Sequence, residues 1–216
     1  MNKNEKLNLI RQTGIIAILR AKSSEQLIAA AEAIRQGGVK VIEVTFTTPG
    51  AVRVIEEASR KYGDDVLFGA GRVLDPETAR TAILAGAGFI VAPTLNVQVI
   101  ELCNRYSIPV KPGRLGAAES LTAWEAGASM IKLFPACIGG PDFLKAILAP
   151  LPQVELVPVG GVELNNSAAF IRAGATALGI GSSLVNQKLL DSSDFPELTR
   201  RAAAFIGAVY KGRGKA

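Results

Sequence analysis

Short runs of β-branched residues alternate with amphipathic segments along the whole of this 216-residue chain. This alternation is typical of parallel strands joined by crossover helices, because hairpins would bring two strands together with no helix between them. The sequence therefore predicts an α/β fold with eight strands, over residues 14–20, 39–46, 66–70, 88–91, 108–111, 129–134, 155–159 and 177–180.

Helical segments are expected between these strands, and several of them end at glycine. They cover residues 24–36, 51–62, 76–85, 97–106, 118–126, 143–148, 165–172 and 195–210, after a short N-terminal helix. Gly37, Gly86, Gly127 and Gly174 follow four of these segments, as glycine often does at helix ends. Eight strand–helix units in about 200 residues fit one small TIM (β/α)8 barrel, so we expect a single domain over residues 1–216. A doubly wound sheet is the alternative.

The composition narrows the class of protein. No apolar stretch reaches the roughly 18 residues of a membrane span, and the first residues lack the apolar centre of a signal peptide, so a soluble cytoplasmic protein is expected. Cys103 and Cys137 lack CxxC spacing and are expected to be reduced. Histidine is absent, which removes the commonest general base and metal ligand. We expect no metal or cofactor.

The formal charge of +5 raises the question of nucleic acid binding. Lysine and arginine are scattered, however, except in a basic C-terminal tail that holds Lys211, Arg213 and Lys215 and is expected to be solvated. We therefore expect no nucleic acid or membrane partner. A positive field favours small anionic ligands mildly.

Lys132 lies within the apolar run of residues 130–135. A charge in a buried strand is costly unless it is paired or its pKa has fallen. Desolvation lowers the pKa of a lysine, and the neutral amine is the form that attacks a ketone to give a Schiff base. The alternative is a structural lysine whose ammonium reaches a carboxylate or the barrel rim.

Glu43 lies in a second apolar strand and is expected to face the same interior as Lys132. It could simply pair with Lys132, although buried ion pairs often add no net stability. It could also move protons between water, a carbinolamine and a substrate hydroxyl.

The active site of a TIM barrel lies where its strands end. Glycines follow the last two predicted strands, at Gly160-Gly161 and at Gly179 and Gly181, and Ser182 and Ser183 come next. TIM barrels commonly bind phosphate here through backbone N–H groups and the N-terminus of a short helix. The alternative is that glycine only permits tight turns.

Five segments together carry a resemblance to a known family. They are residues 42–45 (IEVT), 69–71 (GAG), 131–136 (IKLFPA), 158–162 (PVGGV) and 179–182 (GIGS). In this order they resemble the 2-keto-3-deoxy-6-phosphogluconate (KDPG) aldolase family, which includes 4-hydroxy-2-oxoglutarate aldolase and a phosphogalactonate homologue. The resemblance implies a class I, metal-independent aldolase, usually a homotrimer. Its substrate would be a phosphorylated 2-keto-3-deoxy sugar acid, cleaved to pyruvate and an aldehyde such as glyceraldehyde 3-phosphate.

The same resemblance implies roles for particular residues. Lys132 would be the Schiff-base lysine and Glu43 the general acid and base. Arg20, at the end of the first strand, would hold an anionic end of the substrate. The remaining substrate-binding positions would be Thr47, Arg72, Pro93 and Phe134, with Gly160, Gly161, Gly181, Ser182 and Ser183 in or beside the phosphate site.

Several positions depart from the family pattern. Arg72 replaces the usual threonine of GAGT, and Gly116 and Ala118 replace hydroxyl-bearing residues of the usual TPT. Lys111 replaces an aliphatic residue, and Val159 replaces the threonine of PTGG, although the phosphogalactonate branch also resembles PVGG. Thr47 is arginine in some members and threonine in others.

Two functions therefore stay open. In one, the chain is an aldolase in which Arg72 takes over binding of the substrate carboxylate. In the other, it is a barrel with lost or redirected aldol chemistry that binds small anions or serves as a structural trimer. The retained Glu43, Lys132, Pro93, Phe134 and glycines favour the enzyme.

Overall fold

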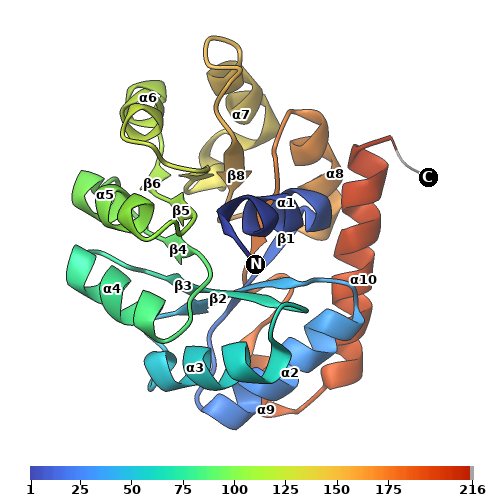
Figure 1. Cartoon of the computed structure of the whole chain (residues 1–216). Coiled ribbons are helices and arrows are strands. Elements are labelled where there is room, and N and C mark those ends of the chain that lie inside the picture. The colour runs from blue at the N-terminus through green and yellow to red at the C-terminus, as the bar shows by residue number, and fades with distance from the viewer. Residues whose placement is uncertain (215–216) are drawn as a thin grey trace.

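The computed structural model describes residues 1–214, in which parallel strands form a curled centre surrounded by helices (Figure 1). One sheet has the order β5-β4-β3-β2-β1-β9, and a second has the order β6-β7-β8. The strands are β1 (Ile15–Leu19), β2 (Val41–Thr45), β3 (Leu67–Gly71), β4 (Ile90–Val91), β5 (Val110–Lys111), β6 (Gly113–Arg114), β7 (Ile131–Leu133), β8 (Leu156–Pro158) and β9 (Leu178–Ile180). The predicted parallel α/β fold is confirmed.

Hydrogen bonds connect the two sheets on both sides. The N–H of Ser129, just before β7, donates to the carbonyl of Val110 in β5 (3.1 Å), and Val159, just after β8, forms an isolated parallel bridge with Gly179 of β9. The predicted fifth strand, over residues 108–111, contains β5 and ends before Pro112, whereas β6 beyond that proline was not predicted and belongs to the other sheet. Proline has no N–H to donate, so it interrupts the hydrogen-bond ladder at this point.

The helices lie close to their predicted positions. They are α1 (Lys3–Thr13), α2 (Ser24–Gln36), α3 (Ala51–Tyr62), α4 (Pro76–Leu84), α5 (Val97–Arg105), α6 (Ala117–Glu125), α7 (Gly140–Leu148), α8 (Leu164–Arg172), α9 (Gln187–Asp191) and α10 (Phe195–Gly212), with the 3-10 helix η1 (Ala136–Ile138). Side-chain caps explain several starts: Ser23 accepts from the N–H of Gln26, and Asp75 from that of Thr78. Helix α7 begins three residues before its predicted start, and α9 and η1 were not predicted.

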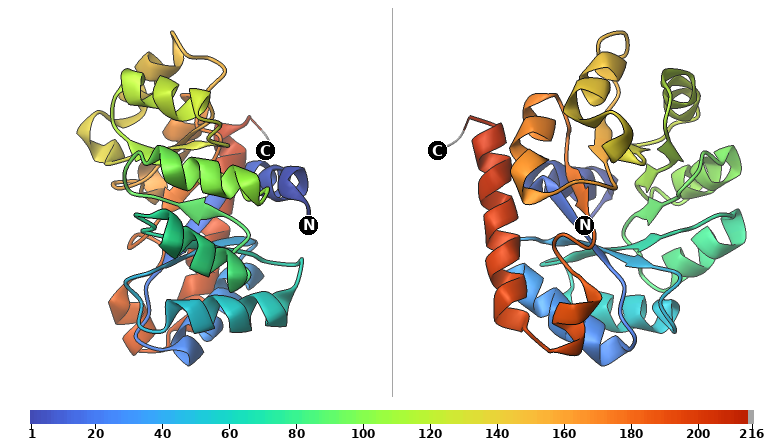
Figure 2. Two further views of the ribbon diagram at one scale, coloured as in Figure 1. Left: turned by 60° about the vertical axis from the view of Figure 1, so that its left-hand side comes forward. Right: turned by 180° about the vertical axis from the view of Figure 1, so that it is seen from behind.

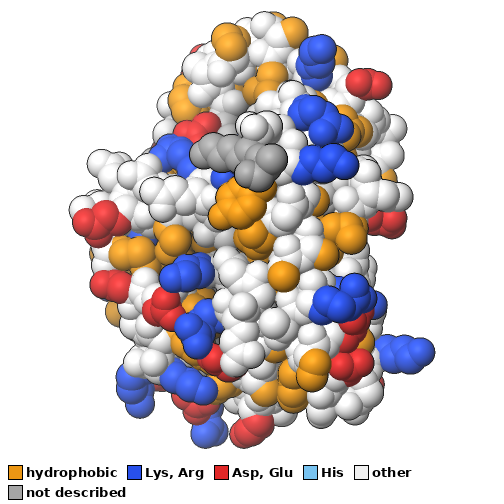
Figure 3. Space-filling view, turned by 90° about the vertical axis from the view of Figure 1, so that its right-hand side faces the viewer, with side chains coloured by type: hydrophobic (Ala, Val, Ile, Leu, Met, Phe, Trp, Pro, Cys, Tyr) orange, Lys and Arg blue, Asp and Glu red, His pale blue; other side chains and the backbone are white. Residues whose placement is uncertain are grey.

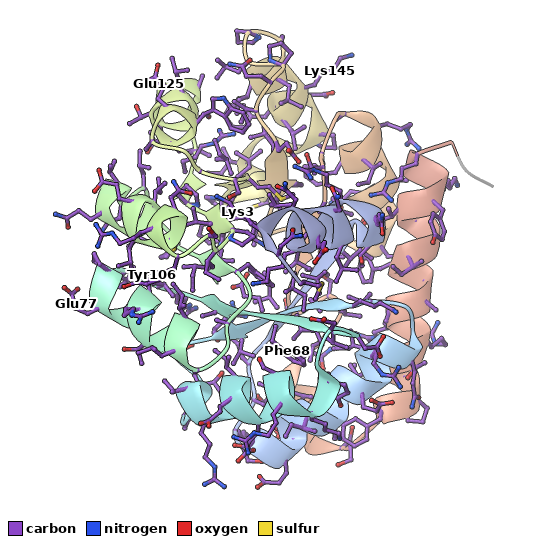
Figure 4. All side chains as sticks on the ribbon, viewed as in Figure 1. Lys3, Phe68, Glu77, Tyr106, Glu125 and Lys145 are labelled. Atoms are coloured by element: carbon purple, nitrogen blue, oxygen red, sulfur yellow. The ribbon has the colours of Figure 1, made fainter. Side chains whose placement is uncertain are left out.

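The helices cover the outer face of the strands, as Figure 2 shows from two further directions. Outward-facing strand residues such as Ile42 and Ile131 belong to the larger apolar cluster, which includes buried residues of these helices. Phe68 of β3 packs beside Tyr62 of α3, with ring centroids 5.6 Å apart (Figure 4). Figure 4 also labels Glu77 of α4, Glu125 of α6 and Lys145 of α7, whose side chains project outward.

A second apolar cluster fills the interior, and α1 closes it at one end. Leu7 and Ile10 of α1 pack with inward-facing residues such as Ile16, Ile18 and Val41. Because α1 ends at Gly14 and β1 begins at Ile15, this helix lies where the strands begin. The carboxyl ends of the strands are therefore the end that α1 leaves uncovered.

The basic tail differs from the prediction. Lys211 is part of α10, and the Arg213 guanidinium donates to the carbonyls of Gln12 (2.8 Å) and Arg11 at the end of α1. Unpaired helix-terminal carbonyls accept such bonds readily, so Arg213 is anchored rather than solvated. Lys215 and Ala216 lie outside the described residues.

Charged residues of both signs are interspersed on the face that carries α10 (Figure 3). On this helix Glu197 pairs with both Arg200 and Arg201. Within residues 1–214, no helix is long and apolar enough to cross a membrane.

We predict that Ile10→Ala lowers the free energy of unfolding by about 2–5 kcal/mol, the usual cost of truncating a buried isoleucine. Ile10 is fully buried where α1 closes the interior. Urea denaturation followed by circular dichroism measures the loss, and Asn4→Ala, on the exposed side of the same helix, is the control. A loss as small as that of the control would show that α1 is not part of the cooperative core.

Candidate active site

Glu43 and Lys132 both face the interior, from β2 and β7. Glu43 pairs across the sheet with Ile18, and Lys132 pairs with Val157; both partners belong to the inner apolar cluster. Laterally paired residues of neighbouring strands point to the same face. Only 3% of Glu43 and 8% of Lys132 is exposed, yet within residues 1–214 neither forms an ion pair shorter than 4.0 Å. The alternative of a direct structural ion pair between these two side chains is therefore not seen in this structure.

Burial lowers the pKa of Lys132, and the positive charges of Arg20 and Arg72 lower it further, whereas the negative charge of Glu43 opposes the shift. The Lys132 ammonium lies 4.9 Å from the centroid of the Phe134 ring. A lowered pKa increases the fraction of neutral amine at physiological pH, and the neutral amine is the nucleophile.

Glycines on β3 make room for the Glu43 carboxyl group. A Cβ atom at Gly71 would lie 2.0 Å from Oε1 of Glu43, and one at Gly69 would lie 2.4 Å from the Phe89 ring. Any larger residue at these inward positions would displace the group that it meets. The GAG segment of the sequence is thus explained by the space that the carboxyl group and the ring require.

Arg72 and Thr47 lie next to each other where β3 and β2 end. The guanidinium of Arg72 donates to the Thr47 hydroxyl at 3.4 Å, and that hydroxyl lies 3.2 Å from the Thr45 hydroxyl. Arg72 has a φ of 59°, a left-handed conformation that is uncommon outside glycine and is often found at functional sites. Both Arg72 and Thr47 are exposed and accessible to a ligand.

A pocket of about 130 Å³ lies beside Lys132, at the carboxyl ends of β1, β8 and β9. Seven of the predicted substrate-binding residues line it: Arg20, Phe134, Gly160, Gly161, Gly181, Ser182 and Ser183. Phe134 links the pocket to Lys132 because its ring also lies near the lysine ammonium. The glycines after the last two strands therefore meet Arg20 in one site.

The two glycines after β8 have left-handed φ angles, of 83° at Gly160 and 80° at Gly161. A Cβ atom at Gly161 would also lie 2.5 Å from that of Cys137, so the turn itself requires glycine. After β9, the N–H groups of Leu184 and Val185 donate to the Gly181 carbonyl, which makes a single turn rather than a longer helix. The Ser183 hydroxyl donates to the Val162 carbonyl at 2.6 Å.

Other predicted positions lie outside this pocket. Pro93 is half-buried, and its carbonyl packs against Gly113, the residue that pairs with Lys132. Gly116 begins α6, where its N–H and that of Leu115 donate to the carboxylate of Glu119 (2.9 and 3.1 Å). Ala118 is exposed in the first turn of that helix.

Two cations, Lys111 and Arg114, are buried although the sequence did not predict it. Only 2% of Lys111 is exposed, at the end of a short apolar strand, which is the same sequence signal that identified Lys132. Arg114 is also buried and donates to the carbonyls of Leu115 and Gly116, and burial lowers its pKa to about 10. Arg114 pairs across the sheet with Leu133, which belongs to the larger apolar cluster under the helices, so Arg114 points away from the interior.

Among residues 1–214, no group of three or more histidine, cysteine, aspartate or glutamate side chains is placed to hold a metal ion.

The fold and this site are those of a pyruvate-dependent class of aldolase, and comparison with known proteins agrees. The chain belongs to the KDPG and KHG aldolase family, which it matches over residues 7–201. It is 35% identical over 191 residues to 2-dehydro-3-deoxy-phosphogluconate aldolase of Treponema pallidum, covering 88% of this chain and 90% of the relative. It is also 35% identical over 195 residues to 2-dehydro-3-deoxy-6-phosphogalactonate aldolase of Escherichia coli, covering 90% and 93%.

Solved structures give the same result. A native KDPGal structure superimposes with a TM-score of 0.87 at 34% identity, covering 93% of this chain and 96% of that one. KDPG aldolase from Legionella pneumophila, with pyruvate captured at low pH as a covalent carbinolamine intermediate, gives a TM-score of 0.86 at 28% identity, covering 92% and 96%.

Proposed function

We propose that this protein is a class I aldolase that cleaves or forms a 2-keto-3-deoxy sugar acid, releasing or consuming pyruvate. The observation that carries the proposal is the buried Lys132 amine with a lowered pKa, which faces the same interior as the buried Glu43. The captured carbinolamine in the Legionella relative supports a covalent route through an amine. This route needs no metal, because the protonated imine that Lys132 forms with the keto carbon is the electron sink.

In cleavage, the neutral Lys132 amine attacks the keto carbon, and loss of water from the carbinolamine leaves a protonated imine. The Glu43 carboxylate then takes the proton of the substrate hydroxyl. The carbon–carbon bond breaks, its electron pair moves toward the imine nitrogen, and the aldehyde leaves. Protonation of the resulting enamine and hydrolysis release pyruvate and regenerate the amine.

The pocket beside Lys132 suits an anionic end of the substrate. Arg20 supplies a permanent positive charge, and the glycine turns let a phosphate approach backbone N–H groups closely. We propose that this pocket takes the phosphate of an acceptor such as glyceraldehyde 3-phosphate. We assign the keto-acid carboxylate to Arg72, which lies beside Thr47 and whose charge acts on Lys132.

We further propose that both sheets form one closed (β/α)8 barrel and that residues 1–216 are one domain. The hydrogen bond from Ser129 to Val110 and the bridge between Val159 and Gly179 support closure. A homotrimer in the cytoplasm is proposed as well. A cage designed by fusing symmetric oligomeric domains, 33% identical to this chain, supports an oligomer, and light scattering tests the mass of three chains.

The alternative, an anion-binding or structural trimer without aldol chemistry, is favoured by the changed positions Arg72, Gly116 and Ala118. It differs from the proposed function in one measurable respect, since such a protein forms no covalent adduct with pyruvate.

We predict that pyruvate and borohydride add one reduced pyruvyl group to the protein, because borohydride reduces the imine irreversibly. Intact mass and peptide mapping locate the group, which is expected on Lys132. Lys132→Ala is expected to abolish the adduct and turnover and to stay folded, since it removes a buried charge. An adduct on another lysine, or none, would contradict the proposed function.

We predict that Glu43→Gln reduces turnover by about a hundredfold or more, the usual size of a lost general acid–base group. Pyruvate binding is expected to change less, because glutamine keeps the shape of the side chain. Steady-state cleavage kinetics and pyruvate titration separate the two effects. Unchanged turnover would assign proton transfer to water or to another group.

We predict that Arg72→Thr weakens pyruvate binding and slows adduct formation by about tenfold or more, because a charge-assisted bidentate contact is lost. Arg53→Thr, on the exposed surface of α3, is the matched control. Faster turnover of 2-keto-3-deoxy-6-phosphogluconate in Arg72→Thr would show instead that the arginine blocks the pocket. No change would mean that its side chain points away from the substrate.

A further inference from the structure

Lys111 is a second lysine inside the strand assembly, and the reaction proposed above does not use it. It pairs with Val91 of β4, which belongs to the inner apolar cluster, so its side chain enters the same interior as Glu43 and Lys132. With only 2% exposed, it is deeper than Lys132. Burying an amine costs free energy of desolvation, so a functional reason for its position is expected.

The surroundings of Lys111 connect it to Glu43 through β3. Its ammonium lies 4.3 Å from the centroid of the Phe89 ring, a cation–π contact. That ring packs on Gly69, and the Glu43 carboxyl group packs on Gly71, the next inward position of the same strand. Lys111, through the Phe89 ring, and Glu43 therefore lie over successive inward positions of β3, and both side chains are almost completely buried.

Burial lowers the pKa of Lys111 to about 7; the negative charge of Glu43 opposes this shift, and the positive charge of Lys132 adds to it. Glu43 from β2 and Lys132 from β7 are the two charged groups of the described chain that act on it, and β4 contributes the Phe89 ring. Glu43 has the larger effect of the two, so the charge of Lys111 is coupled more strongly to the carboxylate than to the catalytic amine.

We propose that Lys111 is a positioning residue that controls how readily Glu43 accepts a proton during the aldol reaction. The proposal rests on the function proposed above. When Lys111 is protonated, its charge holds Glu43 as a carboxylate and opposes proton uptake. When Lys111 is neutral, Glu43 accepts the proton more readily.

The charges that appear and disappear along the reaction predict which step depends on the protonation of Lys111. Imine formation replaces the Lys132 ammonium by a protonated imine of the same charge, so the charge of Lys111 affects it little. In the next step, a C–H bond of the imine methyl group breaks. Its electron pair forms the enamine double bond, the imine pair moves to nitrogen, and the proton goes to Glu43. This step neutralises both the protonated imine and the Glu43 carboxylate. A protonated Lys111 opposes the step, because it is attracted to the carboxylate more strongly than it is repelled by the positive charge on Lys132.

Two measurements on the full chain separate these steps. Borohydride trapping with pyruvate reports imine formation, and exchange of the pyruvate methyl protons in deuterium oxide reports proton transfer to Glu43. In the wild type, the ratio of exchange to trapping is expected to fall below pH 7, by up to about tenfold one pH unit lower, as Lys111 becomes protonated.

Variants with a fixed charge at this position sharpen the test. Lys111→Met is permanently neutral, so its ratio is expected to stay high and level between pH 6 and 8. Lys111→Arg is permanently charged, so its ratio is expected to stay low and level. Lys145→Met, on the exposed side of α7, is the control and is expected to keep the wild-type pH dependence.

The inference would be overturned if the ratio of exchange to trapping changed with pH in both Lys111 variants as it does in the wild type. This holds even if the variants lose thermal stability. Absence of trapping in the wild type would instead overturn the proposed function. If neither variant folds, NMR of ¹³C-labelled lysines decides the question without them. One lysine is expected to titrate near pH 7 in the wild type and at lower pH in Glu43→Gln, and titration of every lysine above pH 9 would overturn the inference.

Discussion

The site depends on keeping ionisable side chains in a space that water barely reaches. Burial lowers the pKa of Lys132 and of Lys111, and Glu43 acts against both shifts. Without that carboxylate, all the charges that act on the two amines would be positive. The low dielectric of the interior makes each of these interactions stronger than it would be at the surface, so each group affects the protonation of the others.

The strands and α1 together maintain this environment. Alternation along parallel strands sends Glu43, Lys111 and Lys132 inward, while their sequence neighbours pack under the helices. Glycine at positions 69 and 71 leaves space for the Phe89 ring and the carboxyl group. Helix α1 covers the end where the strands begin, and the proposed substrate therefore enters at the carboxyl ends, where Arg20, Arg72 and the glycine turns lie.

Membership of the KDPG and KHG aldolase family accounts for the scaffold more fully than for the rim. Arg72 stands where the family usually has threonine, and its guanidinium contacts Thr47, at a position that is arginine in some members. Arg72 thus supplies, from the end of β3, a positive charge that some members of the family carry at the end of β2. Lys111 is a second cation that the family pattern does not include, and its proposed effect concerns the timing of proton transfer rather than the covalent step.

The sequence by itself determined the order of strands and helices, because hydrophobic periodicity and helix-capping residues act over a few neighbouring positions. It also identified Lys132, since a charge in an apolar run is visible without coordinates. The same signal was present at Lys111, but only the packing of β5 against β4 and Phe89 showed that this amine is buried near Glu43. The tertiary structure likewise decided the placement of β6 in the second sheet, the anchoring of Arg213 on α1 and the contact between Arg72 and Thr47. Each of these joins residues distant in the chain, and local sequence patterns carry no information about such distances.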